Sequence, residues 1–214
     1  MRVVSGSAKG RQLKSPKTAG TRPVMDRVKT ALFDILAPRI AGVRFLDLFA
    51  GTGGIGIEAL SRGASAATFI ELSPEIVKLV RENLAITGLT AQAEVLRADA
   101  FKFLQSAAAS GQRYDIVYVA PPQWEGLAAQ AVARLDAHPL TEPGGLVIAQ
   151  IHPRERSDFE ELPALSLLRL TDERRYGSTL LMFFEHGENA ENPEDAENPE
   201  DAKSPEETDK DTSV

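Results

Sequence analysis

The chain's strongest constraint is an apolar segment that runs into closely spaced glycines, FLDLFAGTGGIGIEAL at 45–60. Gly51-Thr52-Gly53-Gly54-Ile55-Gly56 forms a G-x-G-x-x-G turn, and helix-forming residues follow at 57–61. A second apolar run, 67–72, carries Glu71 twenty residues after Gly51. In such a unit the glycines let the backbone approach a ligand, and the acid accepts bonds from ribose hydroxyls. The pattern predicts a site for a nucleoside-containing cofactor; the alternative is a turn that only packs a helix against a strand.

Three features favour S-adenosylmethionine over NAD as that cofactor. Asp47 lies inside the first strand, where a carboxylate would repel a pyrophosphate but suits a cationic amino-acid end. Ala98-Asp99-Ala100 closes a third strand-like run and places another acid beside an adenine-sized slot. A fourth run, 114–119, ends in Ala120-Pro121-Pro122-Gln123, whose prolines hold main-chain carbonyls in fixed positions.

Strand-like and helix-like segments alternate along the chain, which predicts an α/β protein with a doubly wound parallel sheet. The expected strands are 43–49, 67–72, 93–97, 114–119 and 145–151. The expected helices are 26–36, 74–87, 101–109 and 126–137, and 167–171 with 179–185 form a terminal antiparallel hairpin. Ligands of such sheets bind beyond the carboxyl ends of the strands, where we expect Asp47, Glu71, Asp99 and Pro121 to converge.

The net charge of −7 is distributed unevenly. Residues 1–29 hold eight basic side chains against Asp26, and residues 185–214 hold twelve acids against two lysines. We therefore divide the chain into a basic RNA-binding extension (1–25), a methyltransferase domain (26–187) and an acidic tail (188–214). The tail repeats Glu-Asn-Pro-Glu-Asp-Ala at 191–196 and 197–202, and its lack of apolar residues predicts disorder. An extension that is only a solvated terminal segment is the alternative to RNA binding.

The composition favours a soluble, cytoplasmic enzyme, which we expect to be monomeric. Hydrophobic residues make up 43% of the chain, enough for a core, without a run long enough to cross a membrane. The polar, basic N-terminus is unlike a secretory signal. The absence of cysteine excludes disulfides, thiolate metal sites and a cysteine nucleophile. The three histidines, His138, His152 and His186, show no metal-ligand spacing, so we expect no metal and interpret them as surface or loop residues.

The sequence resembles the RsmD family, whose members methylate the N2 amine of a guanine in 16S ribosomal RNA. The resemblance covers residues 1–185, and it is carried by Arg2-Val3-Val4-Ser5-Gly6-Ser7-Ala8-Lys9-Gly10-Arg11, Thr21-Arg22-Pro23-Val24-Met25-Asp26-Arg27-Val28, Leu32-Phe33, Leu46-Asp47-Leu48-Phe49-Ala50-Gly51-Thr52-Gly53 and Glu58-Ala59-Leu60-Ser61-Arg62-Gly63. It implies the seven-stranded, Rossmann-like fold of S-adenosylmethionine-dependent methyltransferases. It also implies small-subunit ribosomal RNA, or an assembled small subunit, as the partner.

One segment departs from the family pattern. The family has Asp-Pro-Pro followed by Phe or Tyr, whereas this chain has Ala120-Pro121-Pro122-Gln123. The acid that would accept a bond from the target amine and the aromatic ring at the fourth position are both absent. Three functions stay open: guanine-N2 methylation of ribosomal RNA, amino-methylation of another RNA base or of DNA adenine, and RNA binding without catalysis.

The expected site residues fall into three groups. We expect the cofactor to contact Asp47, Phe49, Gly51, Thr52, Gly53, Gly56, Glu71, Leu72, Asp99 and Ala100. The expected catalytic residues are Ala120, Pro121, Pro122, Gln123 and Trp124, with Trp124 supplying a stacking face. The expected RNA-binding residues are Arg2, Lys9, Arg11, Arg22 and Arg27.

Overall fold

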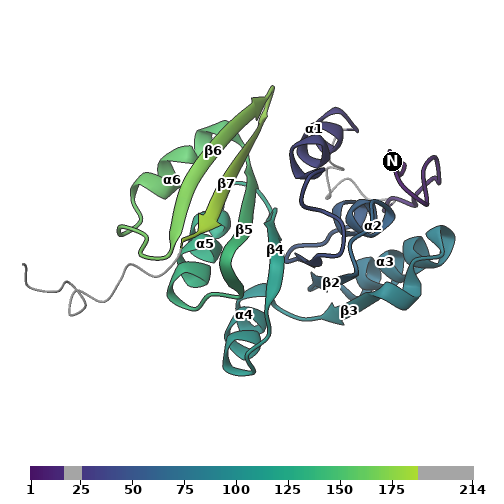
Figure 1. Cartoon of the computed structure of the whole chain (residues 1–214), viewed down its shortest axis with the longest axis horizontal. Helices are drawn as coiled ribbons and strands as arrows, with labels where there is room; N and C mark the ends of the chain where they lie inside the picture. Colours follow the sequence, from purple (N-terminus) through teal and green to yellow (C-terminus); the bar gives the residue numbers. More distant parts are fainter. Residues whose placement is uncertain (17–25, 188–214) are drawn as a thin grey trace, which may run out of the picture.

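The computed structural model describes residues 1–16 and 26–187, and it contains a seven-stranded sheet of order β3-β2-β1-β4-β5-β7-β6 (Figure 1). The strands are β1 (Arg44–Asp47), β2 (Ala66–Glu71), β3 (Ala93–Arg97), β4 (Tyr114–Val119), β5 (Thr141–Ile151), β6 (Leu168–Tyr176) and β7 (Thr179–His186). Strands β1 to β5 are parallel, and β7 pairs antiparallel with both β5 and β6. The predicted doubly wound sheet with a terminal hairpin is confirmed. The expected acidic tail lies outside the described residues.

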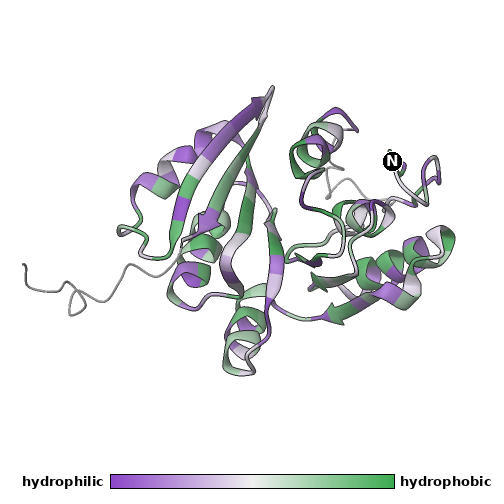
Figure 2. Ribbon diagram, in the orientation of Figure 1, coloured by the Kyte–Doolittle hydropathy of each residue, from purple (hydrophilic) through white to green (hydrophobic). Residues whose placement is uncertain are grey.

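Helices cover both faces of the sheet. The first three, α1 (Asp26–Leu36), α2 (Gly54–Ser61) and α3 (Pro74–Thr87), pack on one face, while α4 (Ala100–Ala109) and α5 (Leu127–Ala137) pack on the other (Figure 1). Two 3-10 turns are also present: η1 (Thr90–Gln92) lies between α3 and β3, and η2 (Pro153–Arg156) follows β5. A short α6 (Ser157–Glu160) comes directly after η2. Apolar residues concentrate on the inner strands and on the helix faces turned towards them (Figure 2). None of the helices in the described ranges is long and apolar enough to cross a membrane.

Most element boundaries match the sequence expectation, and the exceptions have packing reasons. Helix α2 begins at Gly54, three residues earlier than the expected start at residue 57. The start of this helix is packed too tightly for side chains, because a Cβ at Gly56 would lie 2.3 Å from the Phe69 ring and one at Gly54 would lie 2.7 Å from Met1 Sδ. The expected turn at 143–145 is instead part of β5, and β6 continues five residues beyond the expected end at 171.

The N-terminal segment 1–14 is built into the domain. Its apolar side chains Val3, Ala8 and Leu13 are buried in the same core cluster as α1, α2 and α3. Arg2 and Gln12 form an isolated antiparallel bridge, which folds the segment back on itself. The expected boundary at residue 25 falls within 17–25, outside the described residues, and the part of the extension that is described is not a separate structural unit.

Buried carboxylate and hydroxyl groups of α2 hold this segment in place. Glu58, which is fully buried, accepts bonds from the backbone N–H groups of Val4 (2.8 Å) and Ser5 (2.9 Å). Ser61 Oγ accepts a bond from the Ala8 N–H at 3.0 Å. Gly6 lies so close to α2 that a Cβ there would be 1.7 Å from the Ser61 carbonyl oxygen.

Gly6 and Gly10 make a matched pair for testing this docking. Both have left-handed backbones, with φ of 82° and 83°, but a Cβ at Gly10 would have no neighbour within 4 Å. We expect Gly10→Ala to cost only the left-handed strain of about 1 kcal/mol. Gly6→Ala also separates the segment from α2, so we expect it to lower the free energy of unfolding by roughly 2–4 kcal/mol. Urea denaturation of both variants measures the difference, and equal losses would contradict the tight docking.

Candidate active site at the carboxyl edge of the sheet

Three acids and the Pro-Pro loop meet at one edge of the sheet. Asp47 ends β1 and Glu71 ends β2, while Asp99 follows β3 by two residues and Ala120 directly follows β4. These four strands are parallel neighbours in the order β3-β2-β1-β4, so their carboxyl ends lie side by side. The convergence expected from the sequence is therefore present.

Asp47 is the most deeply buried of the three acids, with 2% of its surface exposed. Its Oδ2 accepts a bond from the backbone N–H of Gly56 at 3.1 Å, which ties the end of β1 to the first turn of α2. Burial raises the pKa of the Asp47 carboxyl from 3.8 to about 7; the Gly56 bond opposes this rise and the nearby Glu71 charge adds to it. The group thus changes charge near neutral pH.

Glu71 links the loop that follows β1 to the loop that follows β2. Its Oε2 accepts a bond from the Gly51 N–H (3.1 Å), and its Oε1 accepts one from the Ser73 N–H (2.9 Å). Ser73 in turn caps α3 through its hydroxyl, as the Ser-Pro-Glu sequence predicts. The side chain is partly exposed, and each carboxylate oxygen has a second lone pair for a ligand.

Apolar residues lie next to Glu71 and Asp99 along the chain at this edge of the sheet. Leu72 is 63% exposed just beyond β2. Phe49 and Phe101 meet edge to face with ring centroids 6.3 Å apart, and both are partly exposed. Asp99 caps α4 by accepting a bond from the Lys102 N–H at 3.0 Å, which orients its carboxylate at the end of β3, while Ala100 is buried beneath. The sequence interpretation overlooked Phe101, although it is the first apolar residue after the Asp99-Ala100 pair.

The glycine loop has the conformations that its residues favour. Gly51 and Gly53 have φ of 50° and 77°, and nothing lies within 4 Å of the position of a Cβ on Gly51. The buried Asn83 of α3 donates to the Thr52 carbonyl oxygen at 3.0 Å and to that of Lys14 at 3.1 Å. Asn83 is a further residue that sequence reasoning missed, because a single polar residue on an amphipathic helix carries no distinguishing signal.

This constellation fits S-adenosylmethionine. Partly exposed carboxylates at Glu71 and Asp99 can accept hydrogen bonds from hydroxyl or amine groups of a ligand, and the neighbouring apolar side chains can pack against a flat ring. The open side of Gly51 permits close approach of a ligand to the backbone. Three carboxylates at this edge disfavour the phosphates of a dinucleotide.

The loop after β4 presents the expected catalytic residues at the same edge. Ala120 and Pro121 are partly buried, whereas Pro122, Gln123 and Trp124 are exposed. Trp124 has a left-handed backbone, its N–H donates to Glu155 Oε1 at 2.7 Å, and its ring lies 4.7 Å from that of His152, centroid to centroid. His152 lies at this edge, and His186 is buried against Thr141, so the interpretation of the histidines as surface or loop residues is wrong for His186.

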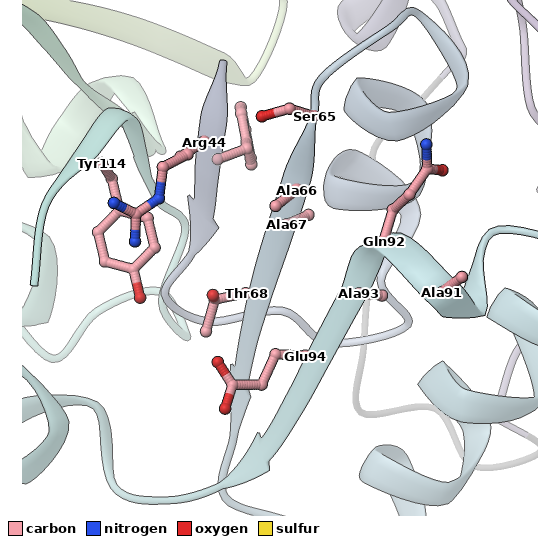
Figure 3. Close-up of a pocket in the computed structure, with 11 residues that line it drawn as sticks. Arg44, Ser65, Ala66, Ala67, Thr68, Ala91, Gln92, Ala93, Glu94 and Tyr114 are labelled. Carbon is pink, nitrogen blue, oxygen red and sulfur yellow. The ribbon is translucent and has the colours of Figure 1, made fainter. Parts of the chain in front are cut away.

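A separate hollow lies at the opposite edge, near the amino ends of the strands. Figure 3 shows the ring of Tyr114 beside Arg44, with Thr68 and Glu94 across the hollow. The Arg44 guanidinium lies 5.5 Å from the centroid of the Tyr114 ring. Ligands of parallel α/β sheets bind at the carboxyl ends, so this hollow is not the expected cofactor site.

The expected RNA-binding residues are spread along the N-terminal side of the molecule. Arg2, Lys9, Arg11 and Arg27 are exposed, and Arg2 Nε pairs with Asp26 at 3.3 Å. Arg22 lies outside the described residues. Lys9 sits in the turn that packs beside Ser61, at the end of α2 farther from the carboxyl edge. The structure therefore places Lys9 away from the carboxyl edge.

Comparison with known proteins identifies the family. The family model described as "Conserved hypothetical protein 95" matches residues 1–185. YlbH of Bacillus subtilis is 38% identical over 180 residues, which cover 84% of this chain and 95% of the relative. Ribosomal RNA small subunit methyltransferase D of Escherichia coli is 40% identical over 136 residues, covering 64% of this chain and 67% of the relative. The chain belongs to the RsmD family.

Solved structures agree with this membership. The Escherichia coli protein yhhF superposes with a TM-score of 0.74 at 32% identity, covering 87% of this chain and 98% of its own. A Salinibacter ruber RNA methyltransferase in complex with S-adenosyl-L-homocysteine has a TM-score of 0.59, covers 83% of this chain and 100% of its own, and at 17% identity shows the fold alone. The family and the fold expected from the sequence are thus confirmed.

The raised pKa of Asp47 gives a pH-dependent prediction. Between pH 4 and 7 the unfolded chain has released this proton while the folded protein still holds it, so stability falls as pH rises. Asp47→Asn removes the ionisation but keeps an oxygen that accepts the Gly56 bond. We expect it to raise the free energy of unfolding at pH 8 by roughly 1–4 kcal/mol and to flatten that pH dependence.

The control for this prediction is Asp34→Asn, which makes the same change at a side chain that is 69% exposed. Denaturant unfolding at pH 5 and pH 8 provides the measurement. If the pH dependence of the free energy of unfolding is the same in both variants, the Asp47 carboxyl is not its source.

Proposed function

We propose that this protein transfers a methyl group from S-adenosylmethionine to the exocyclic N2 amine of a guanine in small-subunit ribosomal RNA. The observation that carries this proposal is the juxtaposition of the acids at the carboxyl ends of β1, β2 and β3 with the Ala120-Pro121-Pro122-Gln123 loop that follows β4. The names of the RsmD relatives support ribosomal RNA of the small subunit as the substrate. Such an enzyme would act in the cytoplasm, where ribosomal subunits assemble, and we propose that it acts as a monomer.

Within this proposal the acids divide the work of holding the cofactor. Glu71 accepts bonds from the ribose hydroxyls, Asp99 contacts the adenine amine beside Leu72 and Ala100, and Phe49 lines the ring. Asp47 and the backbone of Gly51, Thr52, Gly53 and Gly56 hold the methionine end. When bound, the cofactor supplies a methyl group activated on a sulfonium centre. The anionic form of Asp47 attracts the ammonium group of that ligand, whose positive charge in turn favours ionisation of the buried acid.

The loop after β4 orients the target amine. The lone pair of a guanine N2 amine is delocalised into the ring, so acceptors aimed at its N–H bonds help the lone pair turn towards the methyl group. The main-chain carbonyls of Ala120 and Pro121 are the acceptors at this position, and the prolines hold them rigid. Gln123 reads the edge of the base and Trp124 stacks on its face. The amine nitrogen would bond to the methyl carbon as the methyl–sulfur bond breaks and S-adenosylhomocysteine is released, and the amine proton would then leave to solvent.

The substitution at position 120 supports a second candidate, an RNA-binding relative that has lost catalysis. Ala120 lacks the carboxylate that the family places there, and a methyl side chain accepts no hydrogen bond. Amino-methylation of another RNA base or of DNA adenine is the remaining alternative, since the same acceptors would orient any exocyclic amine.

Methyl transfer to defined substrates tests the proposal. We expect the wild type to transfer labelled methyl groups to small subunits, or to 16S RNA, from cells that lack this protein, and digestion should give N2-methylguanosine. Gln123→Ala should lower kcat about tenfold while the affinity for S-adenosylhomocysteine stays the same, because one acceptor is lost at the base. Transfer to DNA or to a different base would overturn the assignment. If the wild type is inactive and Ala120→Asp gains activity, the second candidate is correct.

The role of the basic segment is tested by its exposed charges. Deleting residues 1–20 would remove Val3, Ala8 and Leu13 from the core, so point substitutions are the better probe. Replacing both Lys9 and Arg11 by serine should weaken RNA binding and lower the slope of log affinity against log salt by about 1.5, if each contacts one phosphate. The control replaces Arg113, just before β4, and Arg134, on α5, by serine, which removes the same two positive charges as the Lys9/Arg11 variant. An unchanged slope in the Lys9/Arg11 variant would show that the segment is purely structural.

A further inference from the structure

The backbone of Trp124 is strained. With a φ of 73°, Trp124 is the one residue other than glycine in 1–16 and 26–187 that has a positive φ. Left-handed geometry costs a bulky L-residue about 1–3 kcal/mol, and such strain persists only where the surroundings enforce it. Glycine would remove this cost, and Gly126 two residues later has a similar φ of 64°. A large ring at this position therefore calls for a physical reason.

Glu155 is the group that enforces this conformation. The residue is only 7% exposed, and the two oxygens of its carboxylate accept bonds from two different loops. Oε1 takes the N–H of Trp124 at 2.7 Å, and Oε2 takes the N–H of His152 at 2.9 Å. Bonds from amides to a charged acceptor in a buried setting are among the stronger ones in proteins. One side chain thus fixes the loop after β4 to the residue that follows β5.

As a consequence, the rings of Trp124 and His152 lie together outside the hydrophobic core. The Trp124 and His152 rings lie 4.7 Å apart at 45°, and Trp124 is 61% exposed. The His152 Nδ1 accepts the Arg154 N–H at 3.2 Å, which sets the orientation of the imidazole. Because Val119 and Ala149 pair in register, Ala120 and His152 both follow the same, carboxyl end of the paired strands β4 and β5. Accessible aromatic rings that contact each other at the carboxyl ends of the strands are suited to stacking on a nucleobase.

We propose that Glu155 is a positioning residue that holds Trp124 and His152 as a two-ring platform for the target base. This inference rests on the proposed function, since it concerns how the substrate guanine is received. It also accounts for the missing aromatic at position 123, because the stacking surface is supplied one residue later and from the next strand. Pre-ordering the rings lowers the entropy lost when the base docks.

Trp124 is the chain's only tryptophan, so its fluorescence reports on this platform directly. We expect the anisotropy of wild-type Trp124 to decay with the tumbling of the whole protein, because the ring is held. Glu155→Gln leaves one acceptor oxygen where two are needed, so it should add a fast, local component to the decay. Glu160→Gln is the matched control, since it removes an exposed carboxylate from the same short segment. Unhindered local motion in the wild type, or a Glu155→Gln decay equal to that of the control, would overturn the positioning role.

Methyl-transfer kinetics test the stacking role in the same full-length protein. We expect Glu155→Gln, His152→Ala and Trp124→Gly each to lower kcat by about tenfold or more, with the KM for S-adenosylmethionine unchanged. Trp124→Phe, which keeps a ring, should retain most of the activity, whereas Trp124→Gly relieves the strain and loses the ring. A Trp124→Gly variant with wild-type kcat would refute the platform even if Glu155→Gln proved unstable.

The two proposals fail in different ways. A wild type that methylates ribosomal RNA while all three platform variants remain fully active would defeat the platform and leave the proposed function standing. A wild type that methylates no RNA would defeat the proposed function, and the anisotropy comparison would still decide whether Glu155 holds the ring.

Discussion

The buried carboxylate of Glu58 is the interaction on which much of this structure depends. It lies 3.2 Å from Lys29 Nζ, and both side chains are fully buried. It also accepts the Arg62 Nε–H at 2.9 Å and two backbone N–H groups of the N-terminal segment. Lys29 has a second partner in the Arg2 carbonyl oxygen. A buried charge that lost these partners would cost several kcal/mol, so α1, α2 and the first residues of the chain form one unit.

That unit determines where the cofactor loop lies. Helix α2 begins in the glycine loop and carries Glu58 and Ser61 on the side turned towards the N-terminal segment. On its sheet side Gly56 packs against the Phe69 ring and donates to Asp47. The helix is therefore held from both sides, and the loop that precedes it has little freedom of position. The Gly-x-Gly-x-x-Gly spacing thus reflects packing as much as ligand contact.

The sequence predicted the sheet, its terminal hairpin and the convergence of Asp47, Glu71 and Asp99, because hydrophobic periodicity and strand-end position carry those features. It could not predict the partners of buried polar groups. Glu155 lies more than thirty residues from Trp124, and only the adjacency of β4 and β5 brings them together. The basic side chains of the N-terminal segment predict contacts with RNA, whereas its small apolar residues, Val3 and Ala8, determine how the segment packs. Charge patterns report what faces solvent and say little about what lies beneath.

The contacts of the N-terminal segment also bear on the order in which the chain folds. Ser5 and Glu58 are 53 positions apart, and Lys14 and Asn83 are 69 apart. During synthesis the segment leaves the ribosome before its partners on α2 and α3. Contacts of such long sequence separation form slowly, because a large loop must close before they return any stabilisation. Residues 1–14 are therefore made before their partners yet dock late, and the Thr52 carbonyl gains its Asn83 bond only when α3 has been completed.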